Sequence, residues 1–184
     1  MMNRERPVPV RLFAAGLRAV TAMALILCGF ALCPEARAAE PRNFAVTKVA
    51  MENRAPDFVL KDLNGRPFRL SEYRGKRPVL LIFSATWCSF CEAEIPRLKS
   101  LYAAYASRGL EMLNVDIQES KTRVARYAAR HELPYRTLLD EDGTVSGIFE
   151  VRGVPTLTLI DKNGTILCNP CRRVEAYLKT LLEK

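Results

Sequence analysis

The segment VLLIFSATWCSFC, residues 79–91, decides the fold of this chain. Val79–Phe83 is a continuous apolar run without polar alternation, which is typical of a strand buried on both faces of a sheet. The run leads directly to Cys88 and Cys91, after which apolar residues recur at helical spacing as far as Arg108. The segment therefore predicts a buried strand that is followed at once by a helix, with the cysteine pair where the helix begins.

Cys88 and Cys91 have the spacing of a redox dithiol. A thiol is a good nucleophile only as the thiolate, and the unpaired N–H groups and positive dipole end at a helix N-terminus stabilise that form. Cys88 stands where this stabilisation is greatest. Cys91 lies about one turn later on the same face, so its sulfur reaches the first sulfur and resolves a mixed disulfide. The spacing predicts that Cys88 attacks and Cys91 resolves.

The rest of the chain alternates strands and helices. Upstream, Asn64-Gly65 is a tight-turn signal between two short segments, Phe58–Leu60 and Pro67–Leu70, which predicts a small β-hairpin. Downstream the pattern predicts a buried strand at 110–117, a helix at 121–131, a helical turn at 144–149, strands at 156–160 and 165–168, and a final helix at 174–183. This order predicts an α/β fold in which a mixed central β-sheet is flanked by helices.

The N-terminus has the pattern of an export signal. Several arginines precede an apolar run, Ala19–Cys33, and the run ends at Ala36-Arg37-Ala38, a small-x-small cleavage site. Because the run is shorter than the ~20 residues needed to span a bilayer, a cleaved signal at residues 1–38 is favoured over a retained membrane anchor. We expect a flexible lead-in at 39–54 and the folded domain at 55–184.

Composition and charge are those of one globular domain with an extension. The chain has 184 residues, 49% of them apolar and 26% charged. Without residues 1–38 it keeps 23 basic and 18 acidic side chains, a net charge of +5. This surplus is scattered rather than gathered among aromatic residues, which argues against a nucleic-acid partner. The four remaining cysteines form two C-x-x-C pairs, and in an oxidising compartment both are potential disulfides.

Three separated features resemble the thioredoxins: Phe83–Cys91, Pro96 and Gly153–Thr156. More narrowly, Ala55–Asp62 and the turn that follows are similar to the TlpA/ResA/DsbE group. The resemblance covers residues 55–184 and implies a thioredoxin fold with the hairpin as an N-terminal extension.

The same resemblance implies a function. It points to an extracytoplasmic, periplasmic thiol:disulfide oxidoreductase that acts on the disulfides of other proteins, commonly as a reductase in cytochrome c maturation. A membrane electron donor or acceptor is the implied redox partner, and the redox-active disulfide takes the place of any separate organic cofactor. From the residues alone, a reductase and an oxidase or isomerase remain equally open.

The resemblance also assigns the residues around the dithiol. Four residues would shape the substrate groove, with Pro155 as a cis-proline beside the active disulfide: Trp87, Phe90, Val154 and Pro155. Ile82 stands where many thioredoxins bury an aspartate that helps to deprotonate the second cysteine. Glu94, one turn beyond Cys91, is a candidate to tune the acidity of that thiol in its place, and a solvated surface glutamate is the alternative.

Cys168 and Cys171 form a second pair that the group usually lacks. Three interpretations are open: a local structural disulfide, an auxiliary redox pair that exchanges with Cys88 and Cys91, and half of a four-thiolate metal site. The separation of the two pairs does not match a compact zinc ribbon, so we expect no metal.

Other classes of protein fit less well. A non-catalytic metal-binding or structural module that uses all four thiols is the main rival. A peroxidase of the peroxiredoxin type would need Pro-x-x-x-Thr-x-x-Cys, and no threonine stands three residues before Cys88 or Cys91. A copper-delivery protein would want a C-x-x-x-C pair and a positioned histidine, whereas His131, the one histidine, is expected on the surface.

Overall fold

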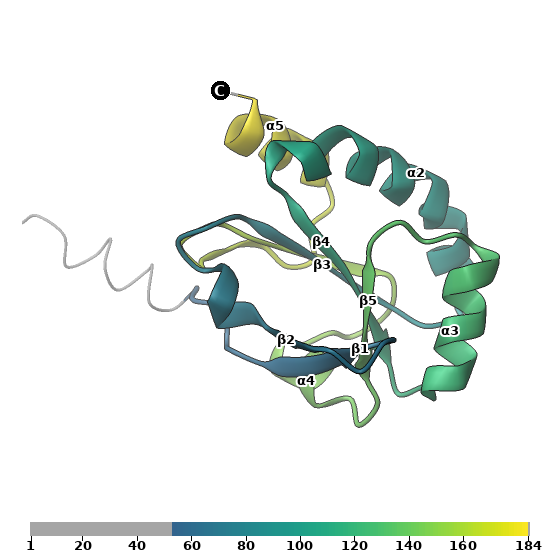
Figure 1. Ribbon diagram of the computed structural model, residues 1–184. Coiled ribbons are helices and arrows are strands. Elements are labelled where there is room, and N and C mark those ends of the chain that lie inside the picture. The colour runs from purple at the N-terminus through teal and green to yellow at the C-terminus, as the bar shows by residue number, and fades with distance from the viewer. Residues whose placement is uncertain (1–52, 184) are drawn as a thin grey trace, which may run out of the picture. The chain divides into compact units, whose positions relative to one another are not determined.

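A mixed seven-stranded sheet runs through residues 53–183, the part of the chain that the computed structural model describes (Figure 1). Its order is β2-β1-β5-β4-β3-β6-β7. The strands are β1 Val59–Asp62, β2 Pro67–Arg69, β3 Val79–Ser84, β4 Glu111–Ile117, β5 Arg136–Asp140, β6 Thr156–Ile160 and β7 Ile166–Cys168. The helices are α2 Ser89–Tyr105, α3 Lys121–Arg130, α4 Thr144–Ile148 and α5 Val174–Leu182, with 3₁₀ turns at Leu70–Tyr73 and Ala106–Arg108.

The predicted strand at the centre of the fold is confirmed. β3 is parallel to β4 on one side and antiparallel to β6 on the other, and all six of its residues are buried. β4 and β5 are also parallel, so each of these connections needs a crossover helix, supplied by α2 and α3. The observed architecture is the thioredoxin-like α/β fold expected from the sequence.

Successive residues of β3 point to opposite faces, and each face has its own core. Leu80 and Ile82 pack with Leu98 and Leu101 of α2 and with Leu178 of α5. On the other face, Leu81 and Phe83 belong to a cluster that includes Phe58, Phe68, Val145 and Phe149. α2 and α5 therefore cover one face, while α4 packs on the other.

The strand β5 was missed by the sequence analysis, and it changes the place of the hairpin. β5 pairs with β1 on one side, through Lys61 opposite Leu139, and with β4 on the other. The predicted hairpin of β1 and β2 is confirmed, but it continues the central sheet instead of standing apart. Arg136 Nε on β5 donates to Asp62 Oδ2 at 2.9 Å, which ties the hairpin down further.

Most of the expected N-terminal organisation lies outside the described residues: the export signal at 1–38 and all of the lead-in up to residue 52. Asn53 and Arg54, the last residues of that lead-in, already belong to the fold, since Arg54 forms a β-bridge with Thr165 and Ile166 N donates to Asn53 O. Within residues 53–183, no helix combines the length and the apolar character needed to cross a membrane.

The short helix α4 depends on a buried carboxylate. Asp140, at the end of β5, is fully buried, and its two oxygens accept the N–H groups of Val145 at 3.0 Å and Ser146 at 2.8 Å. The N-cap residue itself, Gly143, has no side chain to do this. Asp140 therefore satisfies donors at the helix N-terminus that would otherwise be left unpaired in the interior.

We expect Asp140→Ala to lower the free energy of unfolding by about 2 to 3 kcal/mol, because two buried N–H groups lose a charged acceptor. Urea denaturation measures this. Asp142→Ala is the matched control, since exposed Asp142 accepts only the N–H of Thr144 and its loss should cost clearly less. Equal losses in the two variants would contradict the assignment.

Candidate active site

Cys88 is the N-cap residue of α2, as the spacing predicts. Its backbone is extended, with φ −86° and ψ 107°, and its Sγ accepts the N–H of Cys91 at 3.2 Å. Cys88 N in turn donates to Ala85 O at 3.1 Å, which closes the turn between β3 and the helix. The Cys88 sulfur is therefore held against the N–H groups at the first turn of the helix, the position expected of an attacking thiol.

Cys91 faces Cys88 from one turn further along and is packed in an apolar cluster. The two cysteines, 7% and 5% exposed, form this cluster with Ala85, and Val154 packs against it. Burial, followed by the neighbouring Cys88, raises the pKa of the Cys91 thiol to about 12, and the backbone of Ala85 opposes part of that shift. In the dithiol, Cys91 stays protonated at neutral pH.

The loop before β6 completes the site. The Val154–Pro155 peptide bond is cis, as the resemblance implies, and Val154 O accepts a hydrogen bond from Cys88 Sγ at 3.4 Å. Trp87 and Phe90 stand beside the dithiol with exposed fractions of 71% and 77%, the highest of any large hydrophobic side chain in the described part of the chain. The four predicted groove residues thus come together around Cys88, although their contact with substrate stays a prediction.

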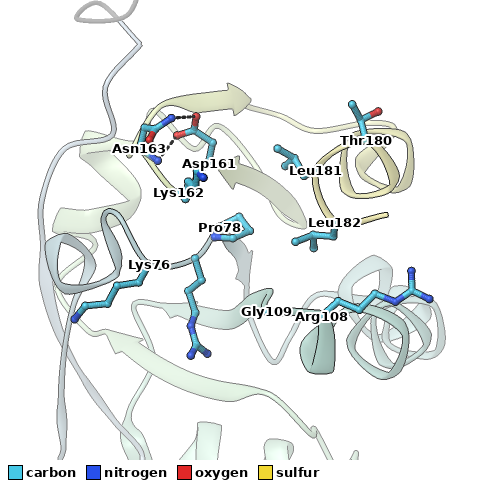
Figure 2. Close-up of a pocket in the computed structure, with 11 residues that line it drawn as sticks. Lys76, Pro78, Arg108, Gly109, Asp161, Lys162, Asn163, Thr180, Leu181 and Leu182 are labelled. Atoms are coloured by element: carbon cyan, nitrogen blue, oxygen red, sulfur yellow. Dashed lines mark hydrogen bonds between the residues drawn. The ribbon is translucent and has the colours of Figure 1, made fainter. Parts of the chain in front are cut away.

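Trp87 stands between two hollows. One, of about 460 Å³, is lined by the Gly153–Val154 loop, Ile117 and Gly147 among others; the other, of about 370 Å³, lies toward α3. A larger hollow of about 550 Å³ lies at the opposite end of the sheet, beside Pro78, which precedes β3, and Gly109, near the start of β4 (Figure 2). The dithiol follows β3, so that hollow is remote from it.

Two buried carboxyl groups behind the dithiol were missed by the sequence analysis. Asp116, at the end of β4, is 1% exposed, and neither of its oxygens has a hydrogen-bond donor in the described residues. Glu119 accepts from both Thr86 N and Thr86 Oγ1 at 2.6 Å, and so holds the turn before Trp87. Asp116 is the one acidic side chain among the buried residues of β4, and a charged residue inside a buried strand is the signal that sequence reasoning had available.

Only one of the two carboxyl groups is ionised at neutral pH. Burial, followed by the proximity of Glu119, raises the pKa of Asp116 to about 8. Burial also raises the pKa of Glu119, but its hydrogen bonds, first those with Thr86, together outweigh that effect and the net shift is downward. At neutral pH Asp116 is therefore protonated and Glu119 ionised. Asp116 also adds a small upward contribution to the pKa of the Cys91 thiol.

We expect Asp116→Asn to stabilise the protein increasingly as pH rises from about 4 to 8. A raised native pKa means that the folded state holds a proton which the unfolded state has released, so wild-type stability falls through this window, by about 1 kcal/mol per pH unit. The amide cannot ionise and escapes that loss. Urea denaturation at pH 5 and pH 8 checks this, and the same difference between variant and wild type at both pH values would show that Asp116 is not the titrating group.

The surroundings of Glu94 and His131 differ from those expected from the sequence. Glu94 forms an ion pair with Arg97, which also contacts Glu175 of α5; its effect on the cysteine thiol stays a prediction. His131 was expected on the surface, and this is wrong. Its side chain is 17% exposed, its ring lies 4.3 Å from that of Tyr127, and Nε2 is buried without a hydrogen-bond partner in the described residues. Besides Tyr127, the ring lies near Glu92 of α2, whose Oε1 is 3.9 Å from Nε2.

The second cysteine pair forms a disulfide between Cys168 and Cys171, at the end of β7. This is the first of the three interpretations that the sequence left open, and exchange with Cys88 and Cys91 stays untested. Cys171 N donates to Leu157 O, so the bridge is attached to β6. Residues 53–183 contain no cluster of three or more histidine, cysteine or acidic side chains arranged to hold a metal ion.

A nucleophilic sulfur at a helix N-terminus, with a second thiol one turn behind it, is built to exchange disulfides. Together with the sheet topology, this defines a thioredoxin-fold thiol:disulfide oxidoreductase. Residues 51–169 match the AhpC/TSA family, and the chain belongs to that family. Within it, the relatives place the chain in the TlpA/ResA/DsbE-like group.

The similarity to known proteins covers most of the described domain. The thiol-disulfide oxidoreductase ResA of Geobacillus thermodenitrificans (strain NG80-2) is 44% identical over 120 residues, 65% of this chain and 68% of that protein. ResA of Bacillus subtilis (strain 168) is 35% identical over 113 residues, 61% of this chain and 63% of its own. A DsbE-type thiol:disulfide interchange protein from Chlorobium tepidum superposes with a TM-score of 0.65 at 26% identity, covering 71% of this chain and 96% of that one.

Proposed function

We propose that this enzyme is a reductase of disulfides in exported proteins, with cytochrome c maturation as its setting. In this role it takes electrons from a membrane donor and needs no separate organic cofactor. An export signal at residues 1–38 and a periplasmic location belong to the same proposal. The named relatives are thiol-disulfide oxidoreductases, which supports the class of reaction.

The observation that carries the proposal is the burial of Cys91. An oxidase draws its driving force from a reduced form that is stabilised, as when a thiolate is strongly favoured. Here the second thiol is 5% exposed and has a pKa of about 12, so its ionisation contributes no stabilisation to the dithiol. As far as Cys91 is concerned, the disulfide form is then comparatively favoured, and this supports a dithiol that donates its electrons to a substrate.

The reaction follows from the placement of the two sulfurs. The Cys88 thiolate attacks one sulfur of the substrate disulfide, and the other substrate sulfur leaves as a thiolate. Cys91 then loses its proton and attacks Cys88 Sγ, which releases the second substrate thiol and leaves a Cys88–Cys91 disulfide. Two electrons pass to the substrate, and a dithiol donor must return them before the next turnover. The exposed Trp87 and Phe90 and the Val154 loop are in position to hold an extended substrate during these steps.

We expect the Cys88/Cys91 couple to have a reduction potential nearer the −270 mV or so of thioredoxin than the −120 mV or so of DsbA. Equilibrium titration against glutathione or dithiothreitol, with each pair read by mass-tagged alkylation, measures it. Cys168→Ser/Cys171→Ser is the control that separates the two pairs. A potential near that of DsbA would overturn the reductase proposal in favour of an oxidase or isomerase. Failure of the pair to titrate reversibly would favour the non-catalytic module.

Cys91→Ser should trap substrate as a mixed disulfide with Cys88, because attack on the substrate is intact while release is lost. Cys88→Ser should form no such adduct and should reduce insulin only at the uncatalysed rate. Non-reducing electrophoresis and mass spectrometry distinguish the two variants. An adduct through Cys91 in the Cys88→Ser variant would reverse the assigned roles.

A further inference from the structure

We propose that the face of α3 beside the dithiol binds an acidic segment of the partner protein, next to the partner's reacting cysteine. This inference rests on the proposed reductase function and names the kind of protein that the same site prefers.

Helix α3 carries four basic residues and no acidic one. Arg123, Arg126 and Arg130 are spaced by three and four residues, which places them on one side of the helix. All three are exposed, and together with Thr86, Trp87 and Tyr127 they line the hollow of about 370 Å³ described above. We call these three side chains the arginine ridge.

The ridge keeps most of its charge. Arg123 lies 3.3 Å from Glu119, but that carboxylate is already held by Thr86. In residues 53–183 no carboxylate lies within 4.0 Å of Arg126 or Arg130. Two guanidinium groups at the rim of the site are therefore free to bind carboxylates, for which their fork of N–H donors is well shaped.

The acidic residues near the ridge do not cancel it. Glu119 is buried, and Glu92 on α2 is turned toward His131, with Oε1 3.9 Å from Nε2. Glu132 follows the helix and is exposed, so one acidic side chain stands near the end of the ridge. Arg152, on the loop before Val154, adds a further cation on the other side of Trp87.

The ridge is continuous with the site of reaction. Trp87 lines both the hollow beside the Val154 loop and the hollow beside α3. A partner chain that passes Cys88 in extended form advances about 3.3 Å per residue, so a few residues beyond its cysteine it reaches the arginines. Asp or Glu at those positions would meet guanidinium groups, while Lys or Arg would be repelled. The arginine ridge therefore distinguishes partner segments by their charge. Trp87 and Phe90 supply apolar contacts that do not depend on that charge.

The test compares three cyclic disulfide peptides that differ only in the residues flanking one cysteine: Asp, Ala or Lys. The purified, fully reduced chain is mixed with each, and single-turnover reduction is followed by alkylation and chromatography. We expect the acidic peptide to react about tenfold faster than the basic one at low salt. The ratio should fall toward one near 1 M salt, where the screening length is about 3 Å. Equal rates for the acidic and basic peptides at low salt would overturn the proposal.

Arg126→Gln/Arg130→Gln should bring the low-salt ratio close to one. The matched control is Lys76→Gln/Lys162→Gln, which removes two exposed charges at the opposite end of the sheet (Figure 2) and should keep the wild-type ratio. If the ratio fell equally in both variants, the effect would come from the net charge of the protein, and this would overturn the proposal. Circular dichroism and thermal unfolding confirm that both variants are folded.

Two further readouts keep the inference separate from the function on which it rests. Failure of the wild type to reduce the neutral peptide would contradict the proposed reductase, whatever the ridge does. Sedimentation with phosphatidylglycerol vesicles, against phosphatidylcholine vesicles, tests a membrane as the occupant. Vesicle binding that depends on Arg126 and Arg130, together with equal peptide rates, would assign the ridge to an anionic membrane surface and overturn the proposal.

Discussion

The position of one sulfur atom organises this protein. Cys88 Sγ is held between the N–H of Cys91 and the carbonyl of Val154, so the helix start and the loop before β6 meet at the same atom. The first contact comes from local helix geometry, and the second requires the whole sheet, because Val154 approaches from a different part of the chain. The pairing of β3 with β6, with Phe83 opposite Thr156, brings the two together.

Both polar groups and apolar packing surround that sulfur. Cys88 is the N-cap residue of α2, and its Sγ accepts the N–H of Cys91. Cys91, one turn deeper, is packed against Ala85 and Val154 and keeps its proton. Behind it, a protonated Asp116 stands beside an ionised Glu119 that holds the Thr86 turn. Such a buried carboxyl pair costs stability at neutral pH, and the apolar packing on both faces of β3 offsets that cost.

The rim of the site is built differently from its interior. Trp87 and Phe90 leave large apolar surfaces in solvent, although burial would be the favourable state for both. Next to them stands a helix with basic side chains and no acidic ones. In the proposed function, the aromatic side chains contact extended partners of many sequences, and the cationic side chains discriminate among those partners by charge. The disulfide of Cys168 and Cys171 is attached to β6 through Leu157.

The sequence by itself determined what depends on neighbours along the chain. The apolar run of β3, the cysteines one helical turn apart, the Asn64-Gly65 turn and the amphipathic α5 are local patterns, and each element is present in the structure. The cis bond before Pro155 followed from the family pattern rather than from periodicity.

Only the tertiary structure decided the features that depend on distant residues. β5 has just two leucines to mark it, and it becomes a strand because β1 and β4 pair with it on either side. Three features arise where segments far apart in the sequence meet: the burial of His131 Nε2, the pairing of Asp116 with Glu119 and the nearness of the α3 arginines to Trp87. The periodicity of the sequence indicates which face of a helix or strand is apolar. The residues that pack against that face are determined only by the folded sheet. These residues set the pKa values and form the recognition surface.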